Sequence, residues 1–375
     1  MSLYIGLMSG TSLDGVDGVL AELGPAAAGR AAMRVLAHHQ AAFPDALRTR
    51  LLQLNSRGDD ELHQAALAAN ALVRIYAEAV HALLRQCELD PSRVRAIGAH
   101  GQTVRHRPQE FDGTGYTLQL MNGALLAELC GIDIVCDLRS RDVAAGGQGA
   151  PLVPALHAAL FATPGVEVAV LNLGGIGNLT LLPAAGPVRG FDCGPGNALM
   201  DLWCQRHQGR AYDAKGQWAA SGRVDPVLLQ GLLAEPFLQR HPPKSTGRDL
   251  FNAVWLDTAL QTLQMPARPD DVQATLAEYT ARAASDALRV HAPRTQRLLV
   301  CGGGAFNDHL MQRLAALLPG VAVSSTADAG VPPLQVEALA FAWLAQAFVE
   351  RRPGSLPAVT GARGPRLLGA LYPAL

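Results

Sequence analysis

Hydrophobic residues in the first 140 positions occur in short runs separated by glycine and polar residues, and these runs predict strands and helices in turn. Residues 3–8 and 16–23 are apolar runs joined by a turn of serine, glycine and threonine, and alternating apolar positions predict a third strand at 34–43. Apolar residues then recur at helical spacing from 61 to 89, which predicts a long helix that ends before Asp90-Pro91. A buried strand is predicted at 94–99. A strand at 117–121, a helix at 123–130 and a strand at 132–136 follow, and a polar loop occupies 137–150.

The second half of the chain repeats this opening. A strong apolar run at 166–173 leads into a glycine turn at 174–177 and a returning strand at 178–182, and a short strand follows at 189–191. The remaining apolar spacing predicts helices at 197–207, 224–233, 251–263, 272–290, 307–318 and 334–350, and strands at 297–301 and 321–324.

Each half therefore begins with a strand, a glycine turn and a returning strand. This indicates an internal duplication of element order, without repetition of the sequence itself. Alternating strands and helices predict a mostly parallel sheet with helices on both faces. Two such halves predict a cleft between them, which is a common place for a ligand.

Composition supports a globular enzyme-sized protein. The chain has 375 residues, is 49% hydrophobic and 17% charged, and carries a formal charge of -1. Its length predicts about two or three domains. The high apolar fraction excludes a disordered chain, and the near-zero charge disfavours a nucleic-acid or basic membrane-surface protein.

Lysine is nearly absent. Of 31 basic residues only Lys215 and Lys244 are lysines, and the other 29 are arginines. Neither lysine lies in the GxxxxGK[ST] pattern of a Walker A loop, and no lysine precedes residue 215 to serve a protein-kinase site. If the protein uses ATP, it must hold the phosphates by another route.

The sequence also predicts a cytoplasmic location. It begins without a basic stretch followed by an apolar run, and it has no uncharged apolar stretch of about 18 residues. Its six cysteines are scattered without CxxC spacing, as is typical of reduced, buried thiols, and they offer no paired zinc ligands.

Two glycine turns at corresponding places in the halves are candidate phosphate-binding loops. Glycines permit close backbone approach, and exposed N–H groups with hydroxyls form a donor surface for phosphate oxygens. An ordinary hairpin turn is the alternative interpretation, and a dinucleotide fingerprint is disfavoured because strand-like residues follow the second turn. The candidates are Gly10, Thr11, Ser12, Leu13, Asp14, Gly15, Val16 and Asp17 in the first turn, and Gly174, Gly175 and Asn178 in the second.

A third glycine run, Gly302-Gly303-Gly304, follows a predicted strand and precedes a helix. Flat glycines there can admit an adenine or ribose face, and a tight strand–helix turn is the competing interpretation.

Asp192 is the candidate general base. It ends a short apolar segment, and a helix begins near Asn197, so backbone donors are expected to face the same space as its carboxylate. A carboxylate that only stabilises the turn is the alternative. Polar residues of the loop at His100, Gln102 and Thr103, together with Gly194 and Asn197, are candidate contacts of the second substrate.

Six segments taken together resemble one family, that of anhydro-N-acetylmuramic acid kinases. They occur in order from residue 5 to Val359–Ala362, and their combination is specific although no single glycine motif is. The segments are GLMSGTSLDGVDGVL (6–20), GAHGQTVRHRP (98–108), NLGGIGNLT (172–180), FDCGPGNALMD (191–201), PPKSTGRDLF (242–251) and CGGGAFN (301–307).

The resemblance implies the actin, Hsp70 and hexokinase superfold. In this α/β fold, two ribonuclease-H-like domains with mixed β-sheets flanked by helices surround a central ATP cleft. We expect domain I at 1–144 plus 357–375 and domain II at 145–356. The implied ATP segment matches Gly10 to Asp17, and the implied catalytic aspartate matches Asp192.

The resemblance also implies the reaction and its cofactors. ATP and water convert 1,6-anhydro-N-acetylmuramic acid to N-acetylmuramic acid 6-phosphate and ADP, with Mg²⁺, in peptidoglycan recycling. The expected partners are these small molecules, with no nucleic acid and no membrane, and a homodimer stays open. A kinase for another amino sugar and a non-catalytic ATP-binding module are the alternatives.

This chain departs from the family pattern at three positions. Met8 stands where many superfold members carry a metal-serving aspartate, so the direct Mg²⁺ ligands are unknown. Cys193 and Gly177 replace the usual threonine and a frequent alanine, and neither change removes a group that the mechanism requires.

Overall fold

The computed structural model describes residues 1–10, 13–24, 32–247, 250–261 and 268–374. The chain folds into two compact units. Unit 1 comprises Met1–Leu160 and Gln335–Leu375, and unit 2 comprises Phe161–Leu334. The first unit is therefore discontinuous in sequence, whereas the second is a single stretch of chain.

Unit 1 is built on a six-stranded mixed sheet in the order β13-β7-β4-β1-β2-β3. Strands β1 and β4 are parallel, whereas β2 runs antiparallel to both β1 and β3. Without the edge strand β13, the order read from the other edge is β3-β2-β1-β4-β7. This is the ribonuclease-H-like order 3-2-1-4-5, with β7 as the fifth strand of that fold. The strands are β1 Ser2–Met8, β2 Gly15–Leu23, β3 Met33–Ala42, β4 Val94–Ala99, β7 Ile134–Cys136 and β13 Ala370–Tyr372, and β5 Gln102–Pro108 pairs only with β6 Gly115–Leu120.

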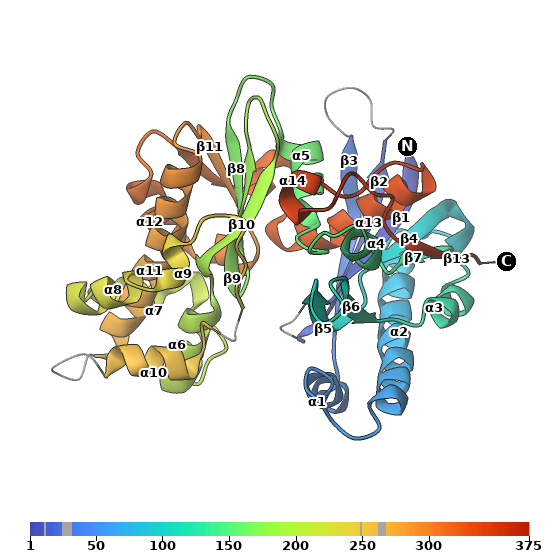
Figure 1. Ribbon diagram of the computed structural model, residues 1–375, viewed down its shortest axis with the longest axis horizontal. Coiled ribbons are helices and arrows are strands. Elements are labelled where there is room, and N and C mark those ends of the chain that lie inside the picture. The colour runs from blue at the N-terminus through green and yellow to red at the C-terminus, as the bar shows by residue number, and fades with distance from the viewer. Residues whose placement is uncertain (11–12, 25–31, 248–249, 262–267, 375) are drawn as a thin grey trace. The chain divides into compact units, whose positions relative to one another are not determined.

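Helix α13, Val336–Val349, packs against β1 and β4 although it comes from the far end of the chain. Figure 1 shows it in red beside the blue and cyan strands. Two glycines permit the contact: a Cβ atom at Gly6 would lie 1.9 Å from the Ala338 carbonyl oxygen, and one at Gly98 would lie 1.9 Å from that of Phe341. No larger residue fits at either strand position without displacing the helix.

Helix α2, Glu61–Gln86, lines the hydrophobic core of unit 1. Leu72, Val73, Tyr76 and Val80 are fully buried there, as the helical spacing of apolar residues predicts. By length and composition α2 is apolar enough to cross a membrane, but 56% of that window is buried inside the protein. The burial fits a core helix.

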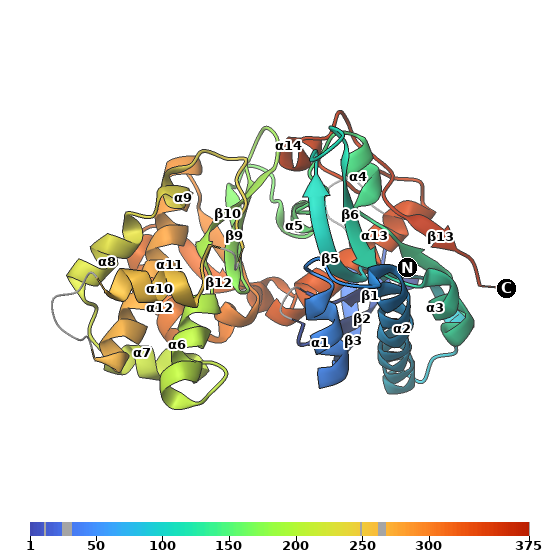
Figure 2. The same cartoon turned by 60° about the horizontal axis from the view of Figure 1, so that its bottom comes forward.

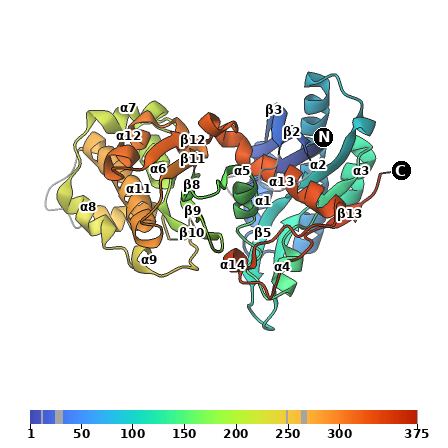
Figure 3. The same ribbon diagram turned by 90° about the horizontal axis from the view of Figure 1, so that it is seen from above.

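Unit 2 repeats the same sheet topology. Its five strands lie in the order β10-β9-β8-β11-β12, with β9 antiparallel to β8 and β10, and β11 parallel to β8 and β12. In Figure 3 helices α7, α8, α11 and α12 lie together beside these strands. The strands are β8 Val168–Leu173, β9 Ile176–Leu182, β10 Arg189–Pro195, β11 Arg297–Cys301 and β12 Ala322–Ser325.

The other helices of unit 1 and its borders are short; Figure 2 shows α4 beside the β5–β6 hairpin. They are α1 Asp45–Gln53, η1 Pro91–Arg93, α3 Gly123–Cys130, α4 Ser140–Ala144, α5 Val153–Phe161, η5 Pro333–Gln335 and α14 Pro357–Thr360. Those of unit 2 are α6 Ala198–Gln208, η2 Ala214–Gly216, α7 Gln217–Ser221, α8 Pro226–Leu233, α9 Pro236–Gln239, α10 Ala253–Leu260, α11 Pro269–His291, η3 Gly303–Phe306, α12 Asp308–Leu317 and η4 Thr326–Ala329.

The sequence-based fold class is confirmed: both units contain a mixed sheet flanked by helices, with the predicted strand–turn–strand opening. The division at 160/161 and 334/335 assigns residues 145–160 and 335–356 to unit 1, although the expected domain II included them. The expected domain boundaries themselves stay a prediction.

Candidate functional site

Three polar side chains form a row across three neighbouring strands of unit 2, and Asp192 lies in the middle of its strand, not at the end that the sequence predicted. Asn178 on β9 lies opposite Asn172 on β8 and opposite Asp192 on β10. Directly opposed residues of antiparallel strands project from the same face. All three are half-buried, so the row is accessible at the edge of the core. The sequence predicted Asn178 and Asp192 as site residues, and the strand register adds Asn172, the first residue of the same glycine motif as Asn178.

Asp192 is held by backbone groups of the 242–247 loop. Its N–H donates to the carbonyl of Lys244 at 3.1 Å, and its Oδ2 accepts from the N–H of Thr246 at 2.9 Å. Burial raises the pKa of Asp192 to about 6, against the lowering effects of the Thr246 hydrogen bond and the Lys244 charge. A carboxylate with this pKa is ionised at neutral pH and still basic enough to accept a proton.

Cys193 forms a bulge next to Asp192 and is buried. Its thiol donates to the Gly177 carbonyl at 3.2 Å, and a Cβ at Gly177 would lie 3.3 Å from the same sulfur. Burial raises the pKa of Cys193 to about 12, so it stays a neutral thiol. Cys193 and Gly177 thus contact each other, and the small residue at 177 makes room for the sulfur.

The Gly174–Gly175 turn is joined to the start of α6. The N–H of Asn197 donates to Gly174 and those of Gly196 and Ala198 donate to Gly175, at 2.8 to 3.1 Å. The Asn197 side chain donates to the Leu173 carbonyl at 2.8 Å. Asn197 precedes the helix as predicted, and the turn takes up the N–H groups of Gly196, Asn197 and Ala198; that further donors of the helix face Asp192 stays a prediction.

The three glycines after β11 have different surroundings. A Cβ at Gly302, where φ is +77°, would lie 2.5 Å from Asn172 Oδ1, and one at Gly304 would lie 2.5 Å from the Leu173 Cβ. A Cβ at Gly303 would have only Asn197 Nδ2 near it, at 3.6 Å, and Gly303 is exposed. Gly302 and Gly304 therefore serve packing against β8, whereas Gly303 is open to a ligand.

Gly194, the remaining glycine candidate of this unit, is buried. A Cβ there would lie 2.9 Å from the Ala283 Cβ on α11, so the absence of a side chain brings β10 against that helix.

In unit 1, the first glycine turn joins β1 to β2, with Met8 opposite Asp17. Thr11 and Ser12 lie outside the described residues. Leu13 and Val16 are buried in the core, and Asp17 Oδ1 accepts from Gln40 Nε2 at 2.6 Å and contacts His38 Nε2 at 3.2 Å. Asp14 is exposed, and its carboxylate has no partner among the residues that the structure describes.

The other members of this turn present backbone only. Gly10 is half-buried, and a Cβ at Gly15 would lie 2.2 Å from the Ala41 carbonyl oxygen, so that glycine is required by the close approach of β3. The described part of the turn thus packs against β3, and Asp14 is its exposed acidic side chain.

His100, after β4, is a buried neutral imidazole. Its Nδ1 donates to the Ser9 carbonyl at 3.1 Å, and its Nε2 accepts from Nε and Nη2 of Arg139 at 3.0 and 2.9 Å. Burial and the charge of Arg139 lower the pKa of His100 to about 3. The guanidinium also donates to the Gly149 carbonyl at 2.8 Å. His100 therefore positions Arg139.

Gln102 and Thr103 begin β5. Gln102 is fully buried and its Nε2 donates to the Gly10 carbonyl at 3.1 Å, while its Oε1 has no partner in the described part of the chain. The half-buried Thr103 hydroxyl accepts from Gln119 Nε2 at 3.1 Å. The structure thus brings Gln102 and His100 of unit 1 to the first glycine turn, where they bind the carbonyls of Gly10 and Ser9.

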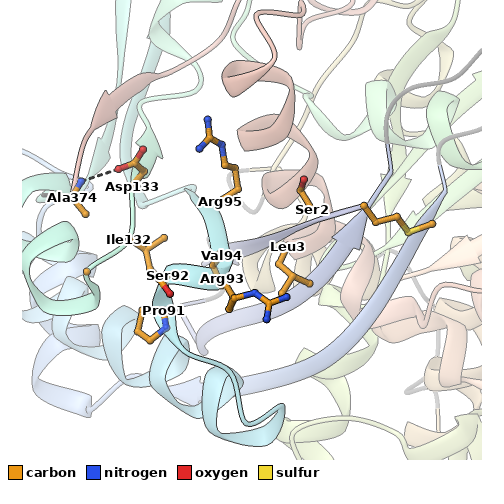
Figure 4. Close-up of a pocket in the computed structure, with 12 residues that line it drawn as sticks. Ser2, Leu3, Pro91, Ser92, Arg93, Val94, Arg95, Ile132, Asp133 and Ala374 are labelled. Atoms are coloured by element: carbon orange, nitrogen blue, oxygen red, sulfur yellow. Dashed lines mark hydrogen bonds between the residues drawn. The ribbon is translucent and has the colours of Figure 1, made fainter.

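A pocket of about 430 Å³ in unit 1 lies elsewhere. It is lined by Ser2, Leu3, Arg93, Arg95 and Asp133 among others, at the start of β1 and β4 (Figure 4). The glycine turn and His100 follow the opposite ends of those strands. This pocket is therefore not part of the candidate site.

In the part of the chain that the structure describes, no three His, Cys, Asp or Glu side chains are grouped to hold a metal ion. All six cysteines are free thiols there, and five are buried. A divalent ion would consequently need ligands from a substrate, as Mg²⁺ commonly takes from phosphates.

The fold and site fit the class of α/β phosphotransferases. Both sheets have ribonuclease-H-like topology and a glycine turn, and the Asp192 carboxylate can act as a general base. The profile of the anhydro-N-acetylmuramic acid kinase family matches residues 2–374. A kinase of that name from Variovorax paradoxus is 61% identical over 378 residues, covering 99% of both chains. One from Bordetella petrii is 62% identical over 374 residues, covering 99% of this chain and 96% of the relative. The chain belongs to the anhydro-N-acetylmuramic acid kinase family.

Proposed function

We propose that the protein is an ATP-dependent kinase that hydrolytically opens 1,6-anhydro-N-acetylmuramic acid and phosphorylates O6. The products are N-acetylmuramic acid 6-phosphate and ADP, and the reaction belongs to peptidoglycan recycling and amino-sugar metabolism. The family match over residues 2–374 carries the proposal. The carboxylate of Asp192, whose pKa burial raises and which the Thr246 N–H holds in place, supports it.

The chemistry assigns one principal task to Asp192. The 1,6-anhydro bridge occupies O6, so the sugar has no free primary hydroxyl. Asp192 takes a proton from water as the water oxygen bonds to C1 and the C1–O6 bond breaks, a general-base step worth about 10²–10⁴-fold. O6 then attacks the γ-phosphorus of ATP, and ADP leaves. Positioning and charge neutralisation account for most of the catalysis of such a transfer.

ATP is bound in this proposal by the two glycine hairpins and the glycine run after β11. The residues are Gly10, Thr11, Ser12, Leu13, Asp14, Gly15, Val16 and Asp17, with Gly174, Gly175, Asn178, Gly302, Gly303 and Gly304. Buried Leu13 and Val16 would contribute backbone groups alone. The open face of Gly303 suits a flat adenine or ribose.

Mg²⁺ fits the donor set as part of its complex with ATP. Mg²⁺ neutralises phosphate charge and retains several waters, so one or two carboxylates suffice. Asp14 suits this role because it is exposed and its carboxylate has no partner among the described residues, whereas Met8 has no side-chain oxygen and Asp17 already has partners on β3.

The sugar is read, in this proposal, by Gln102, Thr103, Gly194 and Asn197, with His100 acting through Arg139. The unpartnered Oε1 of Gln102 is a hydrogen-bond acceptor available to a substrate hydroxyl or amide. We also propose a cytoplasmic location, which free buried thiols support.

A coupled ADP-release assay tests the function. ADP should appear with ATP and the anhydro-sugar, and not with N-acetylmuramate or without sugar. Equal turnover with already opened N-acetylmuramate would point to a kinase for another amino sugar. ATP binding without turnover on any of these substrates would point to a non-catalytic ATP-binding module.

A further inference from the structure

Lys244 is linked to Asp192 through the backbone. Its carbonyl accepts the Asp192 N–H at 3.1 Å, and two residues later the Thr246 N–H donates to Asp192 Oδ2 at 2.9 Å. The segment from Lys244 to Thr246 therefore fixes both the strand position of Asp192 and the direction of its carboxylate.

The side chain of Lys244 binds to the end of α9. Its Nζ donates to the carbonyls of Phe237 and Leu238 at 3.2 and 3.0 Å. Carbonyls at the end of a helix carry its negative pole, so an ammonium suits them; that of Phe237 also accepts the Arg240 N–H at 3.2 Å. The same Nζ stands over the Phe237 ring at 4.8 Å and the Phe191 ring at 6.0 Å.

These contacts occupy the ammonium within the protein. Burial lowers the pKa of Lys244, while the neighbouring Cys193 and Asp192 raise it. Among the described residues Lys244 makes no direct ion pair with Asp192, yet its charge favours the ionised carboxylate. A lysine held in this way is poorly placed to bind phosphate and well placed to support Asp192.

We propose that Lys244 is a positioning residue for the reaction: its ammonium ties α9 to the loop that holds Asp192 and keeps a positive charge beside that carboxylate. The inference rests on the proposed function, because it takes Asp192 as the general base. It gives one of the two lysines of the chain a specific role without any contact to ATP.

Other titratable groups face this pair. Cys193 adjoins Asp192 on β10, Arg240 and His241 follow α9, and His291 ends α11 against the Phe191 ring at 4.9 Å. Lys244 is the cation among them whose charge acts on Asp192. Removing that charge should therefore make Asp192 easier to protonate.

The test compares Lys244→Met, Lys244→Gln and Lys244→Arg with the wild type and with Lys215→Met. Lys215 is the other lysine of the chain, is exposed, and lies outside the proposed site, so its variant is the matched control. Methionine keeps much of the aliphatic stem, glutamine keeps N–H donors without the charge, and arginine keeps the charge. KM values, kcat and the pH dependence of kcat/KM are measured for each.

We expect Lys244→Met and Lys244→Gln to lower kcat by about tenfold or more with little change in either KM, because a displaced base loses reaction geometry. The acid limb of their pH profiles should move to higher pH, whereas Lys244→Arg and Lys215→Met keep the wild-type limb. A raised KM for ATP or sugar with an unmoved limb would make Lys244 a ligand contact and overturn the proposal. Loss of stability with an unmoved limb would overturn it too.

A direct titration separates this inference from the proposed function. The carboxyl carbon of Asp192 is followed by NMR in protein labelled with ¹³C-aspartate, with its signal assigned by its absence in Asp192→Asn. A higher Asp192 pKa in Lys244→Gln supports the role of Lys244 whatever sugar the enzyme uses, and an unchanged pKa contradicts it. Absence of turnover by the wild type with the anhydro-sugar would instead reject the proposed function.

Discussion

The backbone N–H of Thr246 donates a 2.9 Å hydrogen bond to Oδ2 of Asp192, a residue 54 positions earlier. The other carboxylate oxygen, Oδ1, has no hydrogen-bond partner among the described residues. Within the described part of the chain, one oxygen is thus held by a hydrogen bond and the other accepts none. This is the arrangement that a general base requires.

Replacing Asp192 with asparagine should lower kcat by about 10²-fold or more, because the amide cannot take the proton from water. The amide oxygen can still accept from Thr246, so the fold should persist. The ADP-release assay measures the loss. Asp257→Asn, at a surface carboxylate of unit 2 that pairs with Arg206, should remain fully active. An Asp192→Asn enzyme with near-normal kcat would remove Asp192 from the role and direct attention to Asp14.

The pH dependence of kcat/KM should show an acid limb near the Asp192 pKa of about 6. Below that pH the carboxyl is protonated and cannot act as a base, so the rate falls about tenfold per pH unit; above it the rate reaches a plateau. Steady-state kinetics between pH 4.5 and 8 measures this. The residual activity of Asp192→Asn should lack the limb, and a limb that persists in that variant would belong to another group.

Gly302→Ala should change the stability of the protein, whereas Gly303→Ala should change its affinity for ATP. Alanine at 302 meets Asn172 and Leu173 with φ at +77°, and should destabilise the protein by about 1–3 kcal/mol. Alanine at 303 meets only Asn197 Nδ2 at 3.6 Å, so stability should hold while the KM for ATP rises. Thermal unfolding and ATP kinetics distinguish the two. An unchanged KM in Gly303→Ala would remove this glycine from the ATP-binding set.

Gly6→Ala should destabilise the protein by about 2 kcal/mol or more, because the added methyl would press on the Ala338 carbonyl and push α13 from the sheet. Denaturant unfolding measures the change. Gly58→Ala is the matched control, since nothing lies within 4 Å of a Cβ there. Equal stability of the two variants would contradict the close packing of α13 on β1.

Periodicity sufficed to predict the strand–turn–strand openings and the long helices, because their apolar faces repeat regularly. It missed the short helix α1 at Asp45–Gln53 and strand β5 at Gln102–Pro108. The β5 residues are polar except for Val104 and Pro108 and pair only with β6, outside the main sheet, so no alternation of apolar residues marks the strand.

The candidate site was predicted in part for a similar reason. Asp192 and Asn178 each belong to a sequence motif, so both could be predicted from residue type and position in the sequence. Arg139, Asn172 and Thr246 contribute through a buried guanidinium, a strand register and a backbone N–H. A backbone donor has no residue signature, and a register appears only when strands pair. The sequence also could not show that the N–H groups of Gly196, Asn197 and Ala198 donate to the Gly174–Gly175 turn.

The discontinuity of unit 1 sets the order in which this protein can mature on the ribosome. Residues up to Leu160 emerge first, but the faces of Gly6 and Gly98 lack their cover until α13 is made. Unit 2 is contiguous, so its sheet can be completed before that helix exists. The half that is translated second is therefore the first that can finish folding. A nascent chain stalled ahead of Gln335 would expose an unfinished hydrophobic surface to chaperones.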